Sequence, residues 1–143
     1  MKRLSLLLLS FVACINLLAQ EPGNNLRKTI PQLRQSFPDL VVWGYERSGI
    51  QNYKSPEADI LFETKNGIVI AEFASFEGED GYLQGLYQSL LKSFSKNAKT
   101  YRWGNNKNSI SFFYSYFHVY ISYTPNESVS ISYDLNQNLW PKQ

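Results

Sequence analysis

An Asn-Gly pair between two β-prone runs constrains the fold of this chain more than any other feature. The runs Ile60 to Lys65 and Ile68 to Phe76 are rich in β-branched and aromatic residues, and only Asn66-Gly67 separates them. A two-residue hairpin turn needs positive φ at both central positions, which Asn and Gly adopt at low cost. The pair therefore predicts an antiparallel hairpin.

A tight turn at this place also predicts which side chains share a face of the hairpin. Residue 65 would lie opposite 68 and residue 63 opposite 70, so Glu63 and Glu72 would share a polar face as a diagonal pair. Diagonal β-carbons lie about 7 Å apart. The other face would point into the core and would hold the more apolar set: Ile60, Phe62, Thr64, Val69, Ala71 and Phe73.

Two segments have helical patterns. The stronger one, about residues 82 to 97, has apolar residues at helical spacing: Tyr82, Leu83, Leu86, Tyr87, Leu90, Leu91 and Phe94. We expect this stripe to pack onto the apolar face of the hairpin. The shorter one, about residues 30 to 36, begins at a capping box formed by Thr29 and Gln32 and ends at Phe37-Pro38.

The remaining segments complete an element order of α-β-β-β-β-α-β-β. Residues 40–45 and 50–53 are β-prone, residues 100–109 are polar and predict a loop, and residues 113–123 and 129–135 alternate as two paired strands. Hairpin-linked strands with two amphipathic helices predict an α+β fold. We expect an antiparallel sheet of about five to six strands with both helices on one face. No motif assigns this order to a family.

The N-terminus predicts export. Lys2 and Arg3 precede an apolar stretch, and Ala19 offers a small residue before Gln20. The stretch is shorter than the roughly 20 apolar residues of a membrane span. We therefore expect a signal peptide at 1–19, a flexible lead-in at 20–28 and a single α+β domain at 29–143, located in the periplasm or secreted. No other segment is apolar enough to form a transmembrane segment.

The only cysteine leaves an alternative location open. Cys14 ends the stretch Phe11-Val12-Ala13-Cys14, which loosely resembles a lipoprotein box and would anchor the chain through a lipid. Phe at the first position and the apolar residues after Cys14 depart from that pattern. After cleavage at Ala19 no thiol would remain for disulfide or thiolate chemistry.

The charges argue against nucleic acid as a partner. Without Lys2 and Arg3 the basic side chains equal the acidic ones in number, whereas phosphate neutralisation supplies much of the affinity for nucleic acids. The charges are nevertheless segregated. Residues 57–80 hold seven acids, and residues 81–126 hold no acid but five basic side chains, Lys92, Lys96, Lys99, Arg102 and Lys107. Matching to the dipole of the second helix explains most of this basic block, and a charged binding surface is the alternative.

Few residues suggest catalysis. His118 is the only histidine, and the pattern around it supplies neither a nucleophile elbow nor a zinc-ligand spacing, so we interpret it as a residue of a sheet face. Glu63 and Glu72 are the one candidate pair for carboxylate-dependent hydrolysis. Their face also holds Lys65, which favours an ordinary solvated surface. The sequence indicates no metal site and no cofactor.

The best candidate for binding is the predicted loop at 101–107. It combines aromatic, guanidinium and amide groups in Tyr101, Arg102, Trp103, Asn105, Asn106 and Lys107, the types enriched at recognition surfaces. Trp103 could equally cover the core as a plug. The leading hypothesis is an exported, non-catalytic module that binds a protein or a surface ligand. The alternatives are a small hydrolase using Glu63 and Glu72, and an envelope-assembly protein whose sheet edge pairs with another chain.

Overall fold

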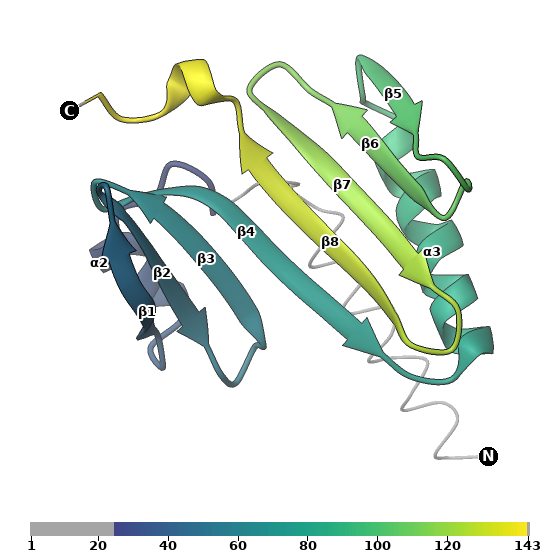
Figure 1. The fold of residues 1–143 in the computed structure, drawn as a ribbon, viewed down its shortest axis with the longest axis horizontal. Helices are drawn as coiled ribbons and strands as arrows, with labels where there is room; N and C mark the ends of the chain where they lie inside the picture. The colour runs from purple at the N-terminus through teal and green to yellow at the C-terminus, as the bar shows by residue number, and fades with distance from the viewer. Residues whose placement is uncertain (1–24, 143) are drawn as a thin grey trace.

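The computed structural model describes residues 25–142. The elements in chain order are α2 (Ile30–Ser36), β1 (Val41–Arg47), β2 (Ile50–Ser55), β3 (Ile60–Lys65), β4 (Ile68–Glu77), α3 (Asp80–Ser95), β5 (Thr100–Trp103), β6 (Ser109–Phe113), β7 (Phe117–Thr124), β8 (Ser128–Leu135) and the 3-10 helix η1 (Gln137–Leu139). Figure 1 shows the strands in one antiparallel sheet, ordered β1-β2-β3-β4-β8-β7-β6-β5. The predicted α+β class with an antiparallel sheet and two helices is confirmed.

The predicted number of strands is wrong, because the described chain forms eight strands instead of five or six. The segment predicted as a loop begins with β5, a four-residue strand. The strand expected at 113–123 is β7 only from Phe117 on, and a further strand, β6, precedes it and folds back on it at residues 114–116. This turn, Tyr-Ser-Tyr, has only Ser115, one of the weaker turn-forming residues, to mark it in the sequence.

The sheet consists of two halves with the same element order. In each half a helix precedes four consecutive antiparallel strands: α2 with β1–β4, and α3 with β5–β8. The halves join through their last strands, β4 and β8. The strand order therefore reads the same from either side of that junction, and the first strand of each half, β1 or β5, forms an edge of the sheet.

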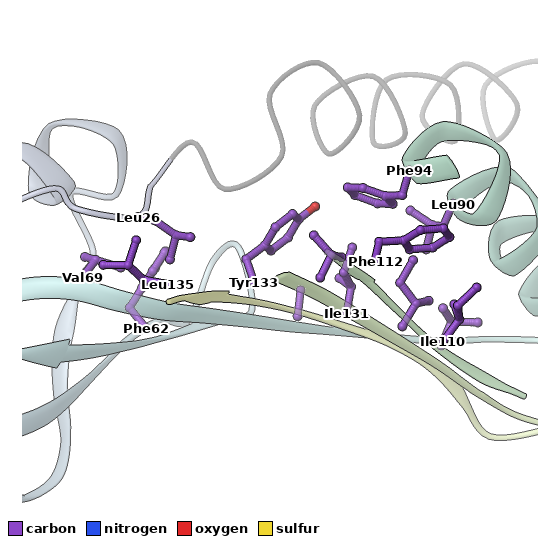
Figure 2. Packing of buried hydrophobic residues seen from close by; sticks show 14 of the residues in the cluster. Leu26, Phe62, Val69, Leu90, Phe94, Ile110, Phe112, Ile131, Tyr133 and Leu135 are labelled. Carbon is purple, nitrogen blue, oxygen red and sulfur yellow. The ribbon is translucent and has the colours of Figure 1, made fainter. Parts of the chain in front are cut away.

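Both helices cover the same face of the sheet, and the core lies between. In the first half Leu33 of α2 is buried and the ring of Phe37 lies 5.0 Å from that of Phe62. In the second half Phe94 of α3 contacts Phe112 of β6 and Tyr133 of β8 (Figure 2). Most of the apolar stripe of α3 is buried as expected, but Tyr82 at its start is 40% exposed. The stripe packs on β6–β8 and not on the β3–β4 hairpin.

The β3–β4 hairpin has the predicted turn but not the predicted register. Asn66 and Gly67 have φ of 50° and 78°, as the turn requires. Beyond Thr64, which pairs with Val69, the register shifts by one residue, so that Glu63 lies opposite Ala71 and Phe62 opposite Glu72. This bulge reverses the faces of the residues that follow it in β4. Glu63 and Glu72 therefore lie on opposite faces, and their expected pairing is wrong.

The described part of the segment expected as a lead-in is held against β4. The N–H of Arg27 donates to the carbonyl of Val69 at 2.8 Å, the N–H of Val69 donates to the carbonyl of Lys28 at 2.9 Å, and Leu26 is buried. The predicted signal peptide, its cleavage site and Cys14 lie outside the described residues. Within residues 25–142, neither helix has the length and apolar character needed to cross a membrane.

Candidate binding surfaces

The segment predicted as a binding loop is an edge strand followed by a tight turn. Tyr101, Arg102 and Trp103 belong to β5, which pairs with β6 and ends the sheet. Tyr101 lies opposite Phe112 and Trp103 opposite Ile110, two buried core residues, so both aromatic side chains lie on the face that α3 covers. Arg102 lies on the other face, opposite Ser111. The side chains predicted to bind together are thus divided: Tyr101 and Trp103 lie on one face of the sheet and Arg102 on the other.

Tyr101 and Trp103 flank a groove between β5 and α3. Its volume is about 360 Å³, and its lining comes from three elements: Gln88, Leu91, Lys92 and Ser95 of α3, Tyr101 and Trp103 of β5, and Ile110 and Phe112 of β6. Trp103 is 40% exposed and Tyr101 is 59% exposed. Trp103 is therefore neither a buried plug over the core nor a free side chain at the tip of a loop.

Hydrogen bonds hold the turn after β5 in one conformation. The N–H of Gly104 donates to the carbonyl of Ser109, and the hydroxyl of Tyr87 in α3 donates to the carbonyl of Lys107 at 3.1 Å. The side-chain oxygen of Asn106 accepts from the N–H of Asn108, whereas Asn105 is exposed at the tip. The amide oxygen of Asn106 is thus already used inside the turn, and Asn105 is the freer of the two candidate amides.

Gly104 lies against the start of β6. A β-carbon at this position would lie 2.0 Å from the hydroxyl oxygen of Ser109, so the Ser109 side chain would have to rotate away. The frame that carries Trp103 is fixed from both sides, by α3 and by β6.

A second candidate surface is the sheet face opposite the helices. His118 and Asp134 lie opposite each other on β7 and β8, with 3.4 Å between Nε2 and a carboxylate oxygen. Glu63 lies two strands from Asp134, with Ala71 between them. Partial burial and the charge of Asp134 raise the pKa of the Glu63 carboxyl. The three side chains form a small polar cluster near the middle of the sheet.

The sequence carries a signal for the His118–Asp134 part of this cluster. Both residues lie on the polar side of two alternating strands, and the turn at 125–127 places Thr124 opposite Ser128. Counting back from that turn places 118 opposite 134. The contribution of Glu63 could not be found in the same way, because the bulge in β4 sets its position.

An apolar hollow lies beside the cluster on the same face. Trp43 of β1, Leu61 of β3 and Phe73 of β4 line it, with Lys54, Asp59 and Ser75 at its rim, and its volume is about 170 Å³. The ammonium group of Lys54 lies 5.2 Å above the Trp43 ring and 3.0 Å from the Asp59 carboxylate. The cation therefore already occupies one face of the Trp43 ring.

Glu72 is excluded from this surface because it lies on the helix-covered face. It is 9% exposed and lies between Phe62 and Tyr133 in the ladder, so neither of its ladder partners is a carboxylate. Burial raises the pKa of its carboxyl to about 7, against the opposing effects of a hydrogen bond from Asn25 and the charge of Lys28. The carboxylate pair expected for hydrolysis is therefore not formed.

Comparison with known proteins adds no assignment. The chain matches no family model, and no curated protein or solved structure is significantly similar to it. Within residues 25–142, no group of three or more His, Cys, Asp or Glu side chains is arranged to hold a metal ion.

Proposed function

We propose that this chain is an exported binding module that recognises a protein through the groove between α3 and β5. The observation that carries the proposal is the pair of half-exposed aromatic side chains, Tyr101 and Trp103, held on a strand above an apolar floor. Aromatic side chains on a rigid frame bury a large area on binding and lose few rotamers. The groove is small enough to receive one or two side chains of a partner.

The chemistry of the groove favours binding over hydrolysis. Ser95 is the only hydroxyl-bearing aliphatic side chain among the described lining residues, and its hydroxyl donates to the carbonyl of Lys92 at 3.1 Å. None of the described lining residues is a histidine or a carboxylate that could act as its base. Lys92 at the rim instead supplies a positive charge for a partner.

The test is a pull-down followed by titration. The protein as isolated from cells is immobilised, partners from the cell envelope are identified by mass spectrometry, and a purified partner is titrated against variants. Trp103→Ala should weaken binding at least tenfold. Its cost in folding stability should stay near 1–2 kcal/mol, below the roughly 3–5 kcal/mol typical of a fully buried Trp, because the side chain is 40% exposed.

Trp43→Ala is the matched control. Trp43 is also a partly exposed tryptophan on an edge strand, 53% exposed, but it lies on β1 at the far end of the sheet and on the opposite face. The variant Trp43→Ala should leave the affinity for the partner unchanged. If Trp43→Ala abolishes binding while Trp103→Ala does not, the contact surface is the open sheet face and the proposal fails.

A further inference from the structure

Among residues 25–142, no strand pairs with the outer edge of β5. The N–H of Gly104 donates to the carbonyl of Ser109, which places this residue pair in hydrogen-bonded positions of the β5–β6 ladder. Hydrogen-bonded positions alternate along an antiparallel strand, so Arg102 also directs its backbone groups toward β6. Tyr101 and Trp103 therefore direct their N–H and C=O groups outward, where the sheet ends.

The opposite edge of the sheet differs in this respect. β1 is the equivalent first strand of the other half, but its register with β2 is interrupted between Trp43 and Arg47, and Gly44 has a φ of 78°. Such irregularities protect edge strands from pairing with other chains. β5 keeps a regular register with β6 over all its residues, and the groove adjoins it on the helix-covered face. Of the two edges, β5 is therefore the one suited to strand addition.

The charges around β5 select the kind of strand that could pair with it. Arg102 lies on the strand itself, Lys92 lines the groove, and Lys96 and Lys99 lie in the short connection from α3. No acidic residue occurs between 81 and 126. Pairing of β5 with β5 of a second copy would bring these basic side chains together, which is unfavourable. An acidic strand would instead be attracted.

From these observations we infer that the partner contributes an extended acidic segment that adds to β5 as a further strand. The segment would exchange backbone hydrogen bonds with Tyr101 and Trp103. Its side chains would alternate: apolar ones on the face of Tyr101, Trp103 and the groove, and acidic ones on the face of Arg102. This inference rests on the proposed function and names the class of ligand for the same site.

A synthetic peptide tests the inference directly. The probe is a fluorescein-labelled heptapeptide that alternates Val and Glu, titrated by fluorescence anisotropy against the purified protein. Two peptides serve as controls: one alternates Val and Lys, and one has the same Val and Glu residues in two blocks. The alternating Val-Glu peptide should bind at least tenfold more tightly than either control, and its affinity should fall with added salt.

Variants assign the charge preference to β5. The variant Arg102→Glu should weaken binding of the Val-Glu peptide at least tenfold and should strengthen binding of the Val-Lys peptide. Arg47→Glu, which makes the same change on the exposed β1 edge, should alter neither affinity. Equal effects of the two variants would overturn the inference, because they would show attraction to the net charge of the protein rather than to β5.

Amide hydrogen exchange measured by NMR separates strand addition from other modes of binding. Bound peptide should slow exchange at Tyr101 and Trp103 and leave Arg102, already paired with β6, unchanged. The inference fails if the peptide does not bind or if Tyr101 and Trp103 exchange at the same rate with and without it. Protection of these amides in the free protein, growing with its concentration, would show self-pairing and would also overturn it.

The outcomes distinguish this inference from the proposed function. A captured partner that needs the Trp103 side chain but leaves the Tyr101 and Trp103 amides exposed would keep the proposed function and reject strand addition. Peptide addition at β5 together with a native partner that ignores Trp103→Ala would support strand addition and reject the groove as the natural site.

Discussion

Glu72 shows most clearly how the environment of one residue changes its chemistry. Its carboxyl is buried on the helix-covered face of the sheet, near Asn25 and Lys28, and its Oε2 atom has no hydrogen-bond partner among the described residues. Burial disfavours the charged form, which is why the pKa rises from 4.5 to about 7. The folded protein therefore holds a proton here that the unfolded chain releases at lower pH.

This difference predicts a pH dependence of stability. Between pH 4.5 and about 7 the folded state binds one more proton than the unfolded state at this residue, so the free energy of unfolding falls as pH rises through that range. The loss should total about 3 kcal/mol, at about 1.4 kcal/mol per pH unit. Urea unfolding at pH 4.5 and pH 8 measures it.

Two variants isolate the contribution of Glu72. Glu72→Gln should remove most of the loss between these pH values, because the side chain no longer titrates. Glu77→Gln removes an exposed carboxylate at the end of the same strand. This variant should lose as much free energy of unfolding between the two pH values as the wild type. A pH dependence that is the same in the Glu72 variant as in the wild type would contradict the prediction.

At the scale of the elements, two glycines have opposite roles. Gly67 takes a φ of 78° in the β3–β4 turn, a conformation that an L residue adopts only with strain. Gly85 lies inside α3, where a β-carbon would meet no atom within 4 Å. Glycine is needed at the first position and weakens the helix at the second.

The same substitution should therefore change stability in opposite directions at the two positions. Gly67→Ala should lower the free energy of unfolding by about 1–2 kcal/mol, because alanine is strained at positive φ. Gly85→Ala should raise it by about 0.5–1 kcal/mol, because alanine restricts the unfolded chain and favours the helix. Urea midpoints of the two variants give the comparison, and a stabilised Gly67→Ala would contradict the turn geometry.

At the scale of the whole molecule, the two halves share one sheet but have separate helices. β4 and β8 pair along seven residue positions, and each also pairs with a strand of its own half. Leu33 of α2 and Leu90 of α3 are both 0% exposed, so each half has a buried anchor of the same kind. Whether the halves unfold together depends on the β4–β8 junction.

We expect the junction to couple the halves into one cooperative unit. Leu33→Ala and Leu90→Ala should each cost about 2–5 kcal/mol, the usual range for truncating a buried leucine. Each variant should lower the exchange protection of amides in β3 and in β6 by the same free energy. Loss of protection confined to β5–β8 in Leu90→Ala would show two independently unfolding halves.

The features that depend on neighbours in the chain could be predicted from the amino-acid sequence. Asn66-Gly67 forms the predicted turn, Thr29 and Gln32 form the predicted capping box, and the stripe around Leu90 is the buried side of a helix. Each of these depends on residues within a few positions of one another. Local conformational preference and periodicity were therefore enough to find them.

Features that depend on partners far along the chain emerge only when the whole sheet has formed. The bulge in β4 moves Glu72 to the core face, and the pairing of β5 with β6 turns an expected loop into the edge strand that carries Trp103. Ladder hydrogen bonds and burial across the sheet outweigh the local signal in both places, because a short strand has little preference of its own. The candidate residues 101–103 were named from the sequence, but the groove beneath them exists only because α3 packs on the second half of the sheet.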